Sequence, residues 1–360
     1  MNYKQLSIIG LFSVALYACD KTETEPTQPY DAGVLVINAG NFFDNNGSIS
    51  LISRDSKIAS IDIFQKENTR SITGGIVDYT EVDGKGIILV DNSTTGQDKI
   101  EIVNARTFKS IATIPSSEIE NPRQVAKVST DKAYITAWAE TGEYPAFYKN
   151  NGYVAVLDLK TNKITKKITV QKGAESIVVV GTEAFVGDVD GGVLQVIDTQ
   201  TDTFKQEIKS VGTLTTIQVD ANNKIWGFVG KNAIRINPQT KQIETTIKVG
   251  TNAQKSPGNL TMSADKKTVY FTYTFYDAAD NYTQKGEAYS FNISDTIIPA
   301  ITPITKKVAT GLGFDATSNI VYVGVTPSYK QSGFVYRYQT NGTLIDSVKA
   351  EIAPTKFFFK

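Results

Sequence analysis

The chain has 360 residues, of which 37 are basic and 37 acidic, with one cysteine and no histidine. The balanced charge gives no electrostatic reason to expect nucleic acid or an anionic membrane surface as a partner. The lack of histidine excludes Ser-His-Asp and Cys-His nucleophilic systems and histidine-ligated zinc. The length suggests two or three domains, unless a repeat architecture holds it as one.

The N-terminal segment has the pattern of a lipoprotein signal peptide. Lys4 precedes an apolar run from Leu6 to Ala18, which is too short to span a bilayer. The run ends at Cys19, and the four residues 16–19 (Leu-Tyr-Ala-Cys) resemble a lipobox, where a signal peptidase cuts before a lipidated cysteine. We therefore expect a signal peptide over 1–18 and a membrane anchor through lipid on Cys19.

The following residues have the composition of a tether. Residues 20–29 contain Glu23, Glu25, Pro26 and Pro29 and show no apolar periodicity. We expect a flexible tether over 19–32, followed by one domain over 33–360.

From Val34 onward the sequence consists of short β-branched and aromatic runs separated by Gly, Asn, Asp and Thr, with no long stretch of helical spacing. This pattern predicts an all-β fold. One unit recurs: a β-rich run, a loop, a second run ending near Asp or Asn, a polar turn and a third run. Seven copies of the second run start near Ser48, Lys99, Tyr153, Val193, Ala233, Ala288 and Phe334.

The spacing of these copies predicts a seven-bladed β-propeller with four strands in each blade. Tyr153, Val193 and Ala233 lie 40 residues apart, which is typical of a propeller blade. The C-terminal run from Lys356 to Phe359 has the character of an innermost strand for the first blade, and pairing the two termini would close the ring without an open edge. An open solenoid or a pair of sandwiches is the alternative.

The longer units grow at the connection between their first and second runs, which in a propeller emerges on the same face as the blade-to-blade turns. These connections are rich in aromatic residues, and such rings suit a planar or bulky organic ligand. Trp138, at a strand end, is expected to support this face. The candidate ligand-binding residues are Phe42, Phe43, Trp138, Tyr144, Phe147, Tyr148, Phe275, Tyr276, Tyr282 and Tyr329.

Three basic residues in the adjoining blade-to-blade turns are candidates for meeting a phosphate or carboxylate of the ligand: Arg70, Arg123 and Lys172. No catalytic residues and no metal site are assigned. Paired carboxylates remain formally open for a hydrolase or lyase. The loop carboxylates are Asp44, Asp91, Glu140, Glu143, Asp188, Asp190, Asp277 and Asp280. The run 188–192 has two carboxylates and a glycine turn, but lacks the further ligands of a calcium loop.

The opening of the first blade, residues 36–43 (Val-Ile-Asn-Ala-Gly-Asn-Phe-Phe) followed by 46–50 (Asn-Gly-Ser-Ile-Ser), resembles the BtuG-like surface lipoproteins of Bacteroidetes. Ala39 stands where that pattern has an acidic residue. Units such as 154–158 (Val-Ala-Val-Leu-Asp) resemble the broader YncE-like seven-bladed propellers. Acidic residues close behind Cys19 are also similar to the surface-export signal of Bacteroidetes lipoproteins.

The BtuG-like resemblance implies a lipid-anchored, cell-surface outer-membrane protein that captures a corrinoid, vitamin B12 or a relative, and passes it to a TonB-dependent transporter. From the residues we expect no enzyme activity, and we expect no cofactor other than a corrinoid bound as ligand. A catecholate siderophore or a glycan is equally compatible with an aromatic face. Propellers also serve as scaffolds for protein partners, which is the alternative from another class.

Overall fold

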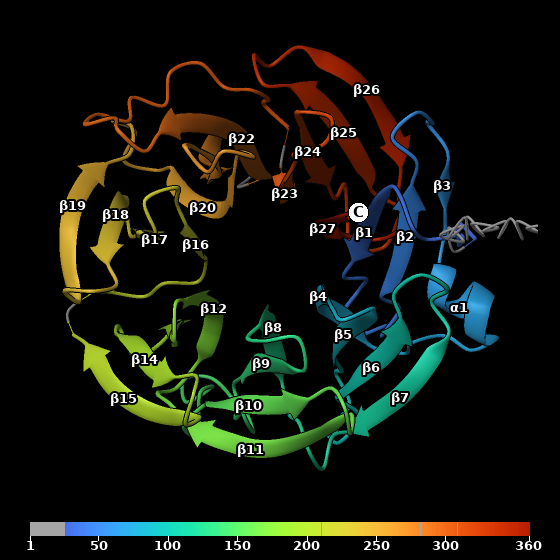
Figure 1. Ribbon diagram of the computed structural model, residues 1–360. Coiled ribbons are helices and arrows are strands. Elements are labelled where there is room, and N and C mark those ends of the chain that lie inside the picture. The colour runs from blue at the N-terminus through green and yellow to red at the C-terminus, as the bar shows by residue number, and fades with distance from the viewer. Residues whose placement is uncertain (1–25, 210, 281–282, 308) are drawn as a thin grey trace, which may run out of the picture.

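The computed structural model describes residues 26–209, 211–280, 283–307 and 309–360. Cys19, the predicted signal peptide and residues 20–25 of the predicted tether lie outside them, as does Tyr282. Seven antiparallel sheets stand around a central opening, as Figure 1 shows. The fold is the predicted all-β, seven-bladed propeller. No helix in the described part of the chain is long and apolar enough to cross a membrane.

We number the blades in chain order and give the strands of each from the centre outward. Blade 1 contains β27 (Pro354–Phe359), β1 (Val34–Asn38), β2 (Ser48–Ile52) and β3 (Ala59–Ser60). Blade 2 contains β4 (Gly75–Val82), β5 (Lys85–Asp91), β6 (Lys99–Asn104) and β7 (Ser110–Pro115). Blade 3 contains β8 (Pro122–Lys127), β9 (Lys132–Ala137), β10 (Tyr153–Asp158) and β11 (Lys163–Thr169).

The remaining blades complete the ring. Blade 4 contains β12 (Ala174–Val180), β13 (Glu183–Asp188), β14 (Leu194–Asp198) and β15 (Thr203–Ile208). Blade 5 contains β16 (Ile217–Val219), β17 (Ile225–Val229), β18 (Asn232–Asn237) and β19 (Gln242–Lys248). Blade 6 contains β20 (Ser256–Met262), β21 (Thr268–Asp277) and β22 (Thr283–Asn292). Blade 7 contains β23 (Ala309–Asp315), β24 (Ile320–Val325), β25 (Phe334–Gln339) and β26 (Leu344–Lys349).

The ring closes in blade 1, where the C-terminal strand β27 pairs with β1. The register runs from Val34 opposite Phe359 to Asn38 opposite Pro354. Strands from the two ends of the chain therefore share one sheet, as the sequence predicts. The pairing leaves no unpaired strand edge at the seam of the ring.

The core lies between the blades. The second strand of each blade is packed on both faces, so that β1 and β5 are almost wholly buried, whereas the outer strands β11 and β15 are mostly exposed and carry lysines. Among the described residues, seven apolar clusters each join two neighbouring blades, and the last joins blades 7 and 1 through Tyr322 and Val34. Burial between blades, rather than within one, therefore holds the ring together.

One described blade differs from the sequence-based expectation of four strands in every blade. Blade 6 has three described strands. The irregular segment 294–307, which contains Pro299 and Pro303, lies where a fourth strand would be. It is attached to β22 by backbone bonds between Ala288 and residues 304 and 305. Proline lacks the N–H that a sheet ladder needs, which disfavours a regular strand there.

A short helix, α1 (Ile63–Asn68), follows β3 and buries Ile63 and Phe64 against blade 1 and blade 2. The end of the predicted tether packs nearby. Tyr30 is buried, its ring lies 5.4 Å from that of Phe108, and its hydroxyl donates to Glu67. Residues 30–32 therefore belong structurally to the propeller rather than to a tether.

Candidate functional site

The two faces of the ring differ in their connections. Because consecutive strands are antiparallel, the links between second and third strands emerge on the same face as the blade-to-blade links. We call this the loop face and the opposite one the turn face. The loop face carries the long β1–β2, β9–β10 and β24–β25 connections at 39–47, 138–152 and 326–333.

Three predicted aromatic residues meet on the loop face above blades 1, 2 and 7. Phe42, Phe43 and Tyr329 expose 47%, 83% and 54% of their surface, and they border a cavity of about 400 Å³ that we call the aromatic pocket. The rings of Phe42 and Phe43 meet edge to face at 5.5 Å. The lining residues are Ala39, Gly40, Asn41, Phe42, Phe43, Gly75, Ile76, Val77, Asp91 and Tyr329.

The β1–β2 loop is fixed by its own hydrogen bonds. The side-chain oxygen of Asn41 accepts from the backbone N–H groups of Phe43 and Asp44, and its amide donates to the carbonyl of Tyr329 at 3.0 Å. The backbone N–H of Gly40, whose φ is +77°, donates to the carbonyl of Ile352. The aromatic pocket is therefore built on an ordered frame and not on a loose loop tip.

A second aromatic cluster stands on the same face over blade 3. Trp138, Phe147 and Tyr148 contact one another edge to face, with centroids 5.2 to 6.0 Å apart. Tyr144 in the same loop is 92% exposed. The position of Trp138 is fixed by its indole N–H, which donates to Glu175 at 2.9 Å.

Arg123 and Asp91 connect the two aromatic groups. The guanidinium of Arg123 lies 3.9 Å from the centre of the Trp138 ring and donates to Asp91 Oδ2. Asp91 in turn lines the aromatic pocket. Arg123, a predicted ligand-contacting residue, is thus already engaged in holding the site together.

A central cavity of about 440 Å³ opens between the innermost strands. Among its lining residues, Lys356 on β27 pairs with Asp78 on β4 at 2.9 Å, and Arg123 is paired with Asp91. Blades 5 and 6 contribute neutral polar groups on the opposite side, namely Thr215, Thr216, Gln218, Asn259 and Thr261. The cavity therefore offers charges that are largely balanced within the protein.

Glu175, on β12, is a further charged residue that lines this cavity. Removal of its carboxyl from water raises its pKa above the ordinary 4.5, although Arg123, Lys356 and the Trp138 indole oppose the shift. Its side chain lines the cavity and is half-buried, and its carboxyl accepts the indole N–H of Trp138. Sequence patterns did not single out Glu175, Lys356 or Asp78, because their convergence requires closure of the ring.

The third group of predicted aromatic residues stands on blade 6. Phe275 and Tyr276 belong to β21 itself, since β21 and β22 extend as a projecting hairpin where the sequence suggested a loop. Tyr276 is 63% exposed, whereas the Phe275 ring is half-buried beneath Lys255 Nζ at 4.9 Å. None of the described residues of this hairpin lines the aromatic pocket.

The other candidates have structural partners or stand alone. Arg70 forms a bidentate pair with Glu101 between blades 1 and 2, at 2.8 and 2.9 Å. Lys172 lies half-buried in the β11–β12 link. The buried carboxylate of Asp188 accepts from the backbone N–H groups of Gly192 and Val193, so it shapes its own loop.

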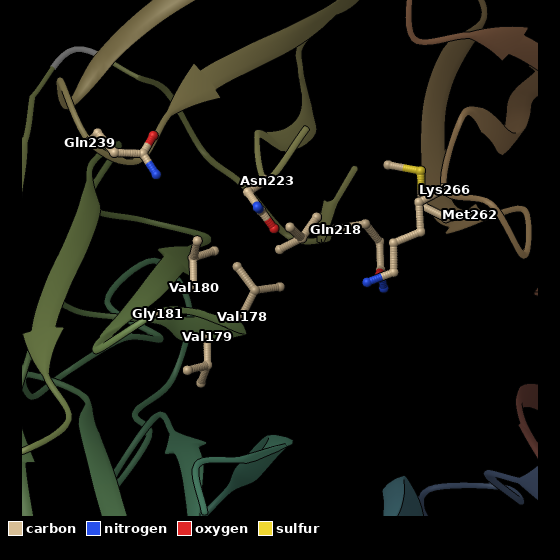
Figure 2. Close-up of a pocket in the computed structure, with 10 residues that line it drawn as sticks. Val178, Val179, Val180, Gly181, Gln218, Asn223, Gln239, Met262 and Lys266 are labelled. Carbon is tan, nitrogen blue, oxygen red and sulfur yellow. The ribbon is translucent and has the colours of Figure 1, made fainter. Parts of the chain in front are cut away.

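The turn face has a cavity of its own, of about 500 Å³, between blades 4, 5 and 6. Figure 2 shows Val178, Val179 and Val180 on one side of it and Met262 and Lys266 on the other. No sequence pattern pointed to this cavity. Its lining has neither an aromatic ring nor a carboxylate, in contrast to the loop face.

Fold and site together define the chain as a seven-bladed β-propeller with an aromatic loop face. The chain belongs to a family described as a domain of unknown function, DUF5074, whose model matches residues 32–359. No curated protein matches it.

Solved structures of similar fold span several activities. A quinonprotein alcohol dehydrogenase-like protein from Bacteroides thetaiotaomicron is 14% identical, with a TM-score of 0.60 over 89% of this chain and 78% of that one. Hydrazine synthase from Kuenenia stuttgartiensis is 13% identical, with a TM-score of 0.57 over 79% and 89%. The dihydro-heme d1 dehydrogenase NirN is 10% identical, with a TM-score of 0.54 over 93% and 77%. At these identities the likeness establishes the fold alone.

Proposed function

We propose that this protein is a ligand-binding lipoprotein of the outer-membrane surface, without catalytic activity, and that its loop face captures a corrinoid for a TonB-dependent transporter. The observation that carries the proposal is the aromatic pocket, where partly exposed rings stand on a hydrogen-bonded frame beside a polar central cavity. Large aromatic rings that are exposed and make few packing contacts with the rest of the protein are typical of binding surfaces. Such rings offer stacking area for a flat macrocycle.

The charges of the central cavity favour a corrinoid over a ferric catecholate. Arg123 and Lys356, the basic residues lining the central cavity, are paired with Asp91 and Asp78. A polyanionic siderophore would need cations that are free to meet it. The likeness of fold to a dihydro-heme d1 dehydrogenase indicates that a propeller is compatible with a macrocyclic ligand, without identifying one here.

The direct test is calorimetric titration of the full-length protein, purified in detergent, with cyanocobalamin and with a ferric catecholate. Saturable binding of cyanocobalamin alone supports the proposal. Binding of the catecholate alone would replace the corrinoid by a siderophore. Binding of neither would favour a glycan or a protein-interaction scaffold.

Matched ring deletions locate the site. Loss of one stacking contact costs about 0.5–1.5 kcal/mol, so Phe43→Ala and Tyr329→Ala should each raise the Kd roughly 2- to 12-fold. Phe204→Ala is the control, because Phe204 on β15 is similarly exposed, at 44%, but stands on the outer wall of blade 4. Equal effects of all three variants would contradict a site on the loop face.

A further inference from the structure

The aromatic pocket contains a buried carboxylate with incomplete hydrogen bonding. Asp91 ends β5, is 7% exposed and lines the pocket. Its Oδ2 accepts from Arg123, whereas its Oδ1 is buried and has no hydrogen-bond partner in the described part of the protein. Buried acceptors are nearly always paired, and an unpaired one in a pocket is a candidate contact for a ligand.

The protein has little scope to satisfy this oxygen itself. The guanidinium of Arg123 is held on three sides, by Asp91, by the carbonyl of Asn121 at 3.2 Å and by the ring of Trp138 at 3.9 Å. Most of the other side chains that line the pocket are apolar or aromatic, and the amide of Asn41 already donates to the carbonyl of Tyr329. Oδ1 is therefore left without a donor from the protein and can accept a hydrogen bond from a bound ligand.

We propose that the aromatic pocket binds a ring-bearing group with a neutral hydrogen-bond donor at its edge, of the carboxamide type, and that Asp91 Oδ1 accepts this hydrogen bond. The χ2 torsion of Asp is soft, so the carboxylate can turn toward the donor with little strain. The inference rests on the proposed function only in taking the loop face as the ligand site. It holds for any carboxamide-bearing ring, including a corrinoid, whose rim carries carboxamides.

The same geometry rejects a carboxylate of equal shape. A carboxylate on the ligand would place lone pairs against the lone pairs of Oδ1, and neither partner would supply the proton. Sites built around a hydrogen bond discriminate strongly against analogues that cannot make it, because the buried group is then left unpaired. The pocket should thus distinguish an aromatic amide from the corresponding acid.

Nicotinamide and nicotinate provide this test at neutral pH, since they share a ring and differ in the donor. We expect the full-length protein in detergent to bind nicotinamide at least about tenfold more tightly than nicotinate in NMR titrations. Asp91→Asn keeps an oxygen for Arg123 and places an N–H₂ donor at the position of Oδ1, so the preference should disappear or invert. Asp190→Asn, which removes an exposed carboxylate elsewhere on the loop face, should leave the preference unchanged.

Equal affinities of the wild-type protein, no binding of either probe, or an unchanged preference in Asp91→Asn would each overturn the inference. If Asp91→Asn does not fold, soaking crystals of the wild-type protein with nicotinamide decides the matter. The amide nitrogen should then lie within hydrogen-bond distance of Asp91 Oδ1, and a position elsewhere would refute the assignment. A nicotinamide preference without cyanocobalamin binding would sustain this inference and remove the corrinoid proposal.

Discussion

At the scale of single residues, some groups of the loop face contribute little to the stability of the fold, whereas Glu175 lowers that stability when it is ionised. The rings of Phe43 and Tyr329 are largely in water, so their removal should change the free energy of unfolding by less than about 0.5 kcal/mol. Glu175 is different, because its carboxyl is held in a poorly solvated position by the fold. Its raised pKa means that the ionised form is less favourable in the folded protein than in the unfolded chain.

The pH dependence of stability follows from this sign. The folded protein binds the Glu175 proton more tightly, so stability decreases as the pH rises from 4.5 through the raised pKa. Glu175→Gln removes the charge while retaining an oxygen for the Trp138 indole. We therefore expect its melting temperature to exceed that of the wild type at pH 7, with no gain at pH 4. A gain of equal size at both pH values would show that ionisation of Glu175 is not responsible.

At the scale of elements, the repeating turn explains why the sequence could be divided into blades. At the link between the third and fourth strands, an Asp or Asn side chain accepts from the backbone N–H groups two and three residues later. Asp158 binds Lys160 and Thr161 in this way, and Asn237 binds Gln239 and Thr240. These hydrogen bonds join residues that are close in the sequence, so the turn can be recognised without knowledge of the fold.

Other elements could not be predicted because their causes are not local. The sequence pattern predicted a loop at Phe275 and Tyr276. These residues instead extend β21, because they pair with β22. The convergence of Asp78, Glu175 and Lys356 depends on three different blades. The sequence therefore singled out the aromatic rings of the loop face together with Arg123 and Asp91, but not Asp78, Glu175 and Lys356.

The closing strand β27 provides a test at this scale. Phe357, Phe358 and Phe359 pack against blades 1, 2 and 7, and β1 has no other neighbour on its inner side. Deletion of residues 354–360 should therefore lower the free energy of unfolding by more than about 4 kcal/mol, through loss of buried rings and an exposed strand edge. The midpoint of chemical denaturation reports this loss of stability. A midpoint equal to that of the wild-type protein would contradict closure through β27.

At the scale of the whole molecule, the N-terminal segment leaves the ring on the turn face. β1 begins there, and Tyr30 packs beside Phe108 in the β6–β7 turn. If Cys19 carries the lipid, the loop face is on the side away from the attachment point. Cys19→Ser should then release the protein from membranes without changing its circular dichroism spectrum, and persistent membrane attachment in a fractionation experiment would refute the lipoprotein assignment.

Hydrogen exchange of the full-length protein, with and without cyanocobalamin, tests most directly whether the loop face is the ligand site. We predict that the ligand slows exchange in the connections at 39–47, 138–152 and 326–333 and leaves the turn-face segments 178–181 and 220–224 unchanged. Protection confined to the turn face, or no protection anywhere at saturating cyanocobalamin, would contradict the account.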